Sequence, residues 1–499
     1  MRVAFTDRRR SERGITIIVT AMLLTIIIPL VGLAIDAGTL YATKAKIQSA
    51  ADAASMAAVR SLSTGLTLAA QETNCKNRAD AYFKANFPEG TGGATIKRID
   101  VTLSETDLHT RVAKVEIEVE APAFFMRYLG FGGTSGIKVN VVGETSRRDV
   151  NIALVLDRSG SLESSGSCDD VETAAITFVS MFANQRDRMA LVTFGGSHKV
   201  DYLSTKNFKD PPTLISEIDK LFPGGCTGWT GSAQGIWTGY QQLVATAEPG
   251  ALNVIVFFTD GRPNTITANW PVKTEITATS PTGTSACYDW ANGLAAGAPG
   301  WNPFAQRYLG WLAGGANGIH QPLAGAIPVT DEGSYQVDIP VGFSGPPPVA
   351  AASDCNYLAS GSGEAWRDIA YIPDNDAYGN SIFGWQPVGT YSAGHPYAGK
   401  GIIGDWTAGE NAAINALDNA AARIRARTSD PSVEVLIYSV GLGDVGDRQH
   451  ELLRRVANDK ASTAFDSSAL EGKYIYAPSG DSLSEAFSAI AAEIMRFSK

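Results

Sequence analysis

Residues 151–161 read NIALVLDRSGS, and this stretch decides the fold of the larger part of the chain. Its first six residues form a continuous apolar run, as expected for a strand covered on both faces in a parallel sheet. Asp157, Ser159 and Ser161 follow on a tight loop and offer one carboxylate and two hydroxyls. Ligands of open α/β sheets bind at the carboxyl ends of strands. Oxygen ligands of this kind suit a hard divalent cation, so the loop predicts a metal site.

Two further loops add oxygen ligands to the same predicted edge. The apolar run NVIVFF at residues 253–258 ends in Thr259-Asp260-Gly261, which supplies a second carboxylate. Between the two strands, the segment GGCTGWTG at residues 224–231 supplies the hydroxyls of Thr227 and Thr230 just before a predicted helix. Three such loops in this order are a stronger signal than any one of them.

The alternation of strands and helices around these loops predicts a doubly wound α/β domain. The predicted strands are Val150–Leu156, Arg188–Phe194, Leu252–Phe258 and Val433–Val440. The predicted helices are Val171–Asn184, Ser232–Ala245, Ala408–Arg427 and an amphipathic closing helix, Leu483–Phe497.

The segment between Gly261 and Asp405 interrupts this alternation. It is rich in Gly and Pro and holds six of the nine tryptophans of the chain, too many for a solvated linker. A structureless loop of this length is improbable inside a compact domain. We therefore expect a folded insertion subdomain at residues 262–405, splitting the α/β domain into residues 147–261 and 406–499.

The N-terminal region predicts a membrane anchor. Residues 14–35 carry no charge, and 22 residues at about 1.5 Å per residue reach about 33 Å, enough to cross the hydrocarbon core. Five arginines precede this stretch, which places residues 1–14 in the cytoplasm and everything after Asp36 outside it. A cleaved signal peptide is the alternative, but the apolar stretch of residues 15–36 is longer than usual and lacks a clear cleavage site.

Residues 37–146 predict a helix packed on a small antiparallel sheet. A stripe of small apolar residues continues at helical spacing after the span, at Ile47, Ala50, Ala51, Ala54 and Ala58. From about residue 94 to residue 144 the period changes to two, which is typical of half-buried strands.

The cysteine spacing and the net charge argue against several classes of function. None of the five cysteines forms a C-x-x-C pair, which argues against zinc and thioredoxin-like chemistry. Cys168 and Cys226 flank the predicted metal loops, so one interpretation is a disulfide at this edge and the other is isolated buried thiols. The same alternatives hold for Cys287 and Cys355 in the insertion, and Cys75 stands apart. A net charge of −10 argues against nucleic acid as a partner.

Enzymatic signatures are weak. The five histidines form no H-E-x-x-H pattern, and no G-x-S-x-G elbow is present, so we expect a non-enzymatic protein. Asp374-Asn-Asp376 begins like a calcium loop, but its twelfth position is Trp385 rather than Glu, which favours a polar turn.

The predicted metal loops resemble the metal-ion-dependent adhesion site of von Willebrand factor A domains, a Rossmann-like α/β fold. Asp157, Ser159 and Ser161 match its first loop, and Asp260 matches its T-D-G loop. Thr230 precedes Gly235-Ile236 at the family's spacing and is the favoured threonine ligand, with Thr227 as the alternative. The resemblance implies a divalent ion, Mg²⁺ with Mn²⁺ or Ca²⁺ as alternatives. It also implies an open position for a carboxylate from a protein partner.

The N-terminal region resembles TadE/TadG-type proteins of the bacterial tight-adherence (Flp) pilus system, specifically the TadG-like branch. The basic head, the D-A-G-T-L-Y that follows the apolar helix, the Ala-rich stripe and the segment APAFFMRYLGFGG at residues 121–133 carry this resemblance. Members processed by a prepilin peptidase have Glu where this chain has Val19, which argues against processing after Gly14.

Together these resemblances imply a single-pass bacterial inner-membrane protein whose A domain is periplasmic or extracellular. We expect metal-dependent protein binding in pilus assembly, pilus anchoring or surface adhesion, with pilus machinery or envelope proteins as partners. The small α+β region at residues 37–146 would be a pilin-like stalk. The alternatives are an adhesin or a chaperone-like partner outside a pilus system, and a metallohydrolase would require a catalytic base near the metal.

Overall fold

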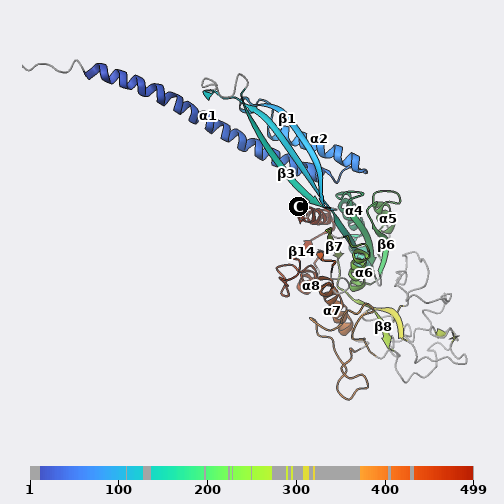
Figure 1. The fold of residues 1–499 in the computed structure, drawn as a ribbon. Coiled ribbons are helices and arrows are strands. Elements are labelled where there is room, and N and C mark those ends of the chain that lie inside the picture. Colours follow the sequence, from blue (N-terminus) through green and yellow to red (C-terminus); the bar gives the residue numbers. More distant parts are fainter. Residues whose placement is uncertain are drawn as a thin grey trace, which may run out of the picture. The chain divides into compact units, whose positions relative to one another are not determined.

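The chain divides into two compact units, one ending at Arg147 and the other beginning at Arg148. Figure 1 draws both units, and each is described by itself. The computed structural model describes residues 12–107, 109–126, 136–195, 198–222, 225–226, 229–248, 250–271, 288–289, 294–295, 307–313, 319–320, 371–402, 406–427, 432–444 and 446–497.

The first unit begins with one continuous helix, α1 (Glu12–Ser61), of 50 residues. Its first half is apolar and solvent-exposed, and among the described residues it is the one helix long and apolar enough to cross a membrane. Pro29 lies inside the helix without ending it. The predicted continuation of the helix beyond the apolar stretch is confirmed.

The rest of this unit packs against the second half of α1. It comprises α2 (Leu68–Asn86), a short 3₁₀ turn (Thr91–Gly93) and the strands β1 (Thr95–Asp107), β2 (Thr110–Ala121) and β3 (Ile137–Arg148). The strands form a sheet in the order β1-β2-β3. The small-residue stripe of α1 is buried in one core with alternate residues of β2, including Val115 and Ile117, as the sequence predicts. The sequence analysis did not predict α2.

The second unit is built on a six-stranded sheet in the order β14-β13-β7-β4-β5-β6. Its strands are β4 (Val150–Asp157), β5 (Arg188–Phe194), β6 (His198–Thr205), β7 (Leu252–Thr259), β13 (Val435–Leu442) and β14 (Lys473–Ala477). Five strands run parallel, and the edge strand β6 is antiparallel to β5. All eight residues of β4 are buried, as its apolar run predicts.

Helices cover both faces of this sheet. One face packs against α3 (Gly160–Ser165), α4 (Cys168–Ser180), α5 (Leu214–Leu221) and α9 (Leu483–Phe497), with a 3₁₀ turn (Gly480–Ser482) before α9. The other face packs against α6 (Ser232–Ala245), α7 (Trp406–Arg425) and α8 (Asp447–Ala457). The predicted α/β fold is therefore confirmed, and α3, α5, α8, β6 and β14 are additions to the predicted elements.

The described parts of the 262–405 segment follow directly from β7. β8 (Thr265–Pro271) pairs with β11 (Arg307–Ala313), which pairs with β12 (Ile319–His320), while β9 (Tyr288–Asp289) pairs with β10 (Leu294–Ala295). Ile266 of β8, Ile372 and Ile382 share a small apolar core with Ala412 of α7. Both ends of the segment thus pack on the α/β domain. Most of its interior, including Cys287 and Cys355, lies outside the described residues.

Candidate functional site

The candidate site lies where the order of the parallel sheet reverses direction. β4 is the first strand of this sheet along the chain, and in space it lies between β5 and β7. The chain leaves β4 toward β5 and later returns to the opposite side at β7, so the carboxyl ends of β4 and β7 flank a topological switch point. Asp157 is the last residue of β4, and Asp260 directly follows β7.

Hydrogen bonds join the two loops at this edge. Asp157 is fully buried, and its Oδ1 accepts a hydrogen bond from the Ser159 amide at 2.7 Å. The Ser159 and Ser161 hydroxyls lie 3.0 Å apart, and the Ser161 hydroxyl donates to Oδ1 of Asp260 at 2.7 Å. The structure therefore brings four of the predicted ligand residues into one connected cluster.

Thr230 also lies at this edge. A Cβ built on Gly261 would lie 3.4 Å from Oγ of Ser161 and 3.6 Å from Oγ1 of Thr230, so both hydroxyls flank Gly261. Thr230 is buried and directly precedes the loop into α6. The alternative threonine, Thr227, lies outside the described residues.

The surroundings of Asp157 and Asp260 disfavour the ionised form of both carboxyl groups. Burial, and then the negative charge of Asp260, raise the pKa of Asp157 to about 7. Burial likewise raises the pKa of Asp260 to about 6. Arg158 and Arg262, the arginines beside the two loops, are held by other partners: backbone carbonyls for Arg158 and Glu410 for Arg262. Asp157 is buried and Asp260 partly buried, and the two neighbouring arginines are bound elsewhere, so this position favours the binding of a positive charge.

Three residues hold the cluster in place through hydrogen bonds, a role that the sequence did not predict for any of them. The Thr259 hydroxyl donates to Oδ2 of Asp157 and accepts from the Gly261 amide. Asn264 fixes the threonine loop through two hydrogen bonds. Its Oδ1 accepts a hydrogen bond from the Thr230 backbone amide at 2.7 Å, and its own backbone amide donates to the Thr230 carbonyl. From α8, the buried Gln449 donates to the Gly261 carbonyl at 2.8 Å. Thr259 opens the T-D-G loop, whereas Asn264 and Gln449 belong to no short motif.

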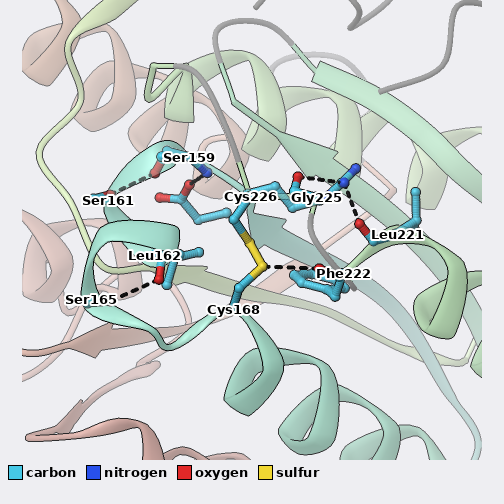
Figure 2. The surroundings of a disulfide bond; sticks show 12 residues. Ser159, Ser161, Leu162, Ser165, Cys168, Leu221, Phe222, Gly225 and Cys226 are labelled. Carbon is cyan, nitrogen blue, oxygen red and sulfur yellow. Dashed lines mark hydrogen bonds between the residues drawn. A yellow bond between two sulfur atoms is a disulfide. The ribbon is translucent and has the colours of Figure 1, made fainter. Parts of the chain in front are cut away.

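A disulfide and a buried arginine brace the first loop. Cys168 at the start of α4 is bonded to Cys226 (Figure 2), which decides between the two interpretations left open by the sequence. The guanidinium of Arg158 is buried and donates to the carbonyls of Leu221 and Gly225, at the carboxyl end of α5. It also lies over the Phe222 ring. The first loop is thus tied to the segment that leads to the threonine loop.

The cluster opens into a cavity of about 510 Å³. Its lining includes Ser161 and Asp260 of the cluster, three further acids, Asp170, Asp444 and Asp481, and residues of the loops that follow α3, β13 and β14. Burial and the nearby Asp481 raise the pKa of Asp170. An ion at the cluster would therefore be reached through a strongly acidic opening.

The other candidate residues serve structural roles. Asp376 is buried, and its carboxylate accepts hydrogen bonds from the Tyr378 and Asn380 amides and from the Asn380 side chain, so Asp374–Asn380 forms a polar turn. His198 is buried beside Tyr378, and Nδ1 of His450 lies 2.6 Å from the Tyr474 hydroxyl. Within the described part of the chain, His, Cys, Asp and Glu side chains form no cluster of three suited to a metal. The candidate cluster has two carboxylates, and its other oxygens are hydroxyls.

Comparison with known proteins identifies two regions. Residues 151–280 match the family model "von Willebrand factor type A domain", and residues 14–61 match "Putative Flp pilus-assembly TadE/G-like". Over 124 residues, 24% of this chain, the sequence is 27% identical to calcium-activated chloride channel regulator 3A-1 of Mus musculus. That match spans only 13% of the length of the mouse protein.

Several solved structures of pilus proteins align with this chain at low similarity. The PilB minor pilin from Streptococcus sanguinis aligns with 13% identity and a TM-score of 0.34, covering 81% of this chain and 79% of that one. The vWF domain of the type V pili tip protein Mfa5 from Porphyromonas gingivalis aligns with 15% identity and a TM-score of 0.32, covering 71% and 97%. These likenesses are distant. The matched regions and the fold together show that the chain joins a TadE/G-like N-terminal segment to a von Willebrand factor A domain.

Proposed function

We propose that this chain is a membrane-anchored, non-enzymatic component of a bacterial Flp pilus system that binds a protein partner through a divalent metal ion. The observation that carries the proposal is the pairing of the buried Asp157 with the partly buried Asp260, linked through Ser159 and Ser161 at the switch point of the sheet. The TadE/G-like match at residues 14–61 supports the pilus context, and the apolar half of α1 supports the anchor.

The residues at the edge fit a hard cation. Asp157, Ser159, Ser161, Thr230 and Asp260 would hold it, as carboxylate and hydroxyl oxygens suit Mg²⁺, with Mn²⁺ and Ca²⁺ as alternatives. The bound ion would act as a Lewis acid that accepts an oxygen ligand from outside. Its charge would also relieve the repulsion between the carboxylates of Asp157 and Asp260. Because two carboxylates leave the ion with little excess negative charge around it, an incoming carboxylate from a partner is a favourable further ligand.

The acidic opening restricts which partners can approach. Asp170, Asp444 and Asp481 would repel an isolated acidic side chain before it reached the ion. A partner that presents its Asp or Glu between lysines or arginines avoids this penalty, because its positive charges face the acidic lining. We therefore expect the partner segment to be a carboxylate flanked by basic residues.

Calorimetric titration of the purified full chain with MgCl₂, MnCl₂ or CaCl₂ tests the metal. We expect saturable binding by the unmodified chain and its loss in Asp157→Ala. The matched control is Asp481→Asn, which removes an acid from the cavity lining without removing a proposed ligand. Equal binding by Asp157→Ala and the unmodified chain would contradict the proposed site.

A capture experiment from bacterial membranes tests the partner. We expect a protein retained by the unmodified chain with Mg²⁺ present, and released by EDTA and by Asp157→Ala. A pilin or another component of the pilus machinery would support the Flp assignment. Recovery of an envelope protein outside that system would instead favour a general adhesin. Retention that is indifferent to EDTA would refute a metal-dependent contact.

A further inference from the structure

A turn after β2 covers the apolar helix at one point. In the apolar part of α1, Gly32 stands out as buried, while its neighbours Val31 and Leu33 are exposed. A Cβ placed on Gly32 would lie 2.5 Å from the Phe125 ring, so this ring packs directly on the helix backbone. A glycine is required at this position for the ring to approach so closely.

The backbone of the same turn is bound by an acid on the helix. Asp36 is fully buried, and its carboxylate accepts hydrogen bonds from three successive amides, those of Phe124 at 3.0 Å, Phe125 at 2.7 Å and Met126 at 2.6 Å. Exposed amides are costly next to hydrocarbon, because no water is present to satisfy them. Asp36 removes that cost for three consecutive residues.

The aromatic side chains of the turn are nevertheless left open. Phe124 is 56% exposed and Phe125 is 39% exposed, although both rings are large and apolar. Gly32 lies three residues before the end of the uncharged stretch at Ile35, or about 4.5 Å along the helix axis. The ring of Phe125 therefore sits at a level of α1 that belongs to the apolar span.

We propose that the Phe124–Met126 turn is a second membrane contact, inserted beside α1 into the leaflet from which the helix emerges. The inference rests on the proposed membrane anchoring of α1. The occupant is the lipid bilayer, because the exposed rings are continuous with the lipid-facing surface of the helix and the turn offers no free amide to a polar partner. Phe124 and Phe125 contact acyl chains near the interface, where aromatic side chains are favoured. Asp36 positions the turn.

Photocrosslinking tests this contact directly. The full chain is reconstituted into vesicles of phosphatidylethanolamine and phosphatidylglycerol, with p-benzoylphenylalanine replacing Phe124, Ile28 or Tyr82. Ile28 is an exposed residue of the apolar span, and Tyr82 is an exposed aromatic residue of α2. After irradiation, mass spectrometry measures lipid adducts at each position. We expect adducts at Phe124 and Ile28, and several-fold fewer at Tyr82.

The other outcomes overturn the inference in distinguishable ways. Adducts at Ile28 without adducts at Phe124 would leave the anchor intact and refute the second contact. A protein crosslink at Phe124, to a second copy or to another chain, would assign the turn to a protein interface instead. Absence of lipid adducts at both positions would refute the membrane anchor and the second contact together.

A pair of glycine variants tests how the turn is seated. Gly32→Leu places a side chain where the Phe125 ring lies, whereas a Cβ on Gly38 of the same helix meets nothing within 4 Å. We expect Gly32→Leu to lower the adduct yield at Phe124 several-fold, with the yield at Ile28 unchanged. Gly38→Leu should leave both yields unchanged. An equal yield at Phe124 in the two variants would contradict the seating of the turn on Gly32.

Discussion

The carboxyl groups of the buried Asp157 and the partly buried Asp260 predict that this site is costly for the metal-free fold, and Asp260→Asn tests that cost. The pKa of Asp157 is raised from 3.8 to about 7, and that of Asp260 from 3.8 to about 6. At about 1.4 kcal/mol per pKa unit, ionising this coupled pair at pH 8 costs several kcal/mol. Removing the Asp260 charge should recover about 2–4 kcal/mol of stability in the metal-free protein.

The dependence on pH follows from the same shifts. Both folded-state pKa values lie above the unfolded values, so the folded protein binds these protons more tightly. The penalty is complete above about pH 7, and it disappears as the pH falls toward the unfolded pKa near 4. We therefore expect the metal-free site to become more stable between pH 8 and pH 6. Asp260→Asn should lose part of that gain, because the charge of Asp260 is the second cause, after burial, of the raised pKa of Asp157.

Hydrogen exchange in the full chain measures this locally. Peptides covering β4 and β7 should be more protected in Asp260→Asn than in the unmodified chain when EDTA is present at pH 8. Excess Mg²⁺ should reverse the order, because the proposed ion stabilises only the unmodified site. Asp481→Asn is the control and should follow the unmodified chain. Weaker protection of Asp260→Asn in EDTA would refute the repulsion on which the prediction depends.

Three further substitutions test the supporting structure. Replacing Cys168 and Cys226 by Ala opens a link across 58 residues and should cost about 4 kcal/mol of unfolding free energy relative to the oxidised native chain, measured by denaturant titration; the reduced native chain is the control and should match the variant, and a loss below about 1 kcal/mol would contradict the bracing role. Arg158→Met leaves two carbonyls unpaired and should cost about 2–4 kcal/mol in the same titration; a loss below about 0.5 kcal/mol would contradict the bracing role. Asp376→Ala removes three hydrogen bonds and should speed proteolysis at the Asp374–Asn380 turn; an unchanged rate would show that this turn holds without its carboxylate.

The sequence predicted the fold well because its strongest signals are local. Continuous apolar runs such as 151–156 and 253–258 have few alternatives to a buried parallel strand, and both are strands of the central sheet. The helix α2 was missed because its exposed face is polar and its buried face is a narrow row at four-residue spacing, Gln71, Cys75, Ala79 and Phe83. Such a row is too narrow to predict a packed helix from the sequence. Its burial depends on contact with α1 and the sheet.

The candidate ligands could be found from the sequence, but their supports could not. Asp157 and Asp260 each end a recognisable strand, so their meeting follows from the order of a parallel sheet. Gln449 lies 188 residues from the Gly261 carbonyl to which it donates, and nothing local distinguishes it from other glutamines. The proposed metal, its partner and the boundaries of the insertion remain predictions.

The unbroken course of α1 has a mechanical consequence (Figure 1). Its 50 residues extend for about 75 Å, and the same rod that carries the apolar surface is buried at its far end against β2. A force applied to the folded part of this unit would be transmitted along the hydrogen-bonded backbone of α1 rather than through a flexible linker. Detachment from a bilayer would therefore require transfer of the whole apolar segment into water, since α1 contains no flexible linker that could extend first.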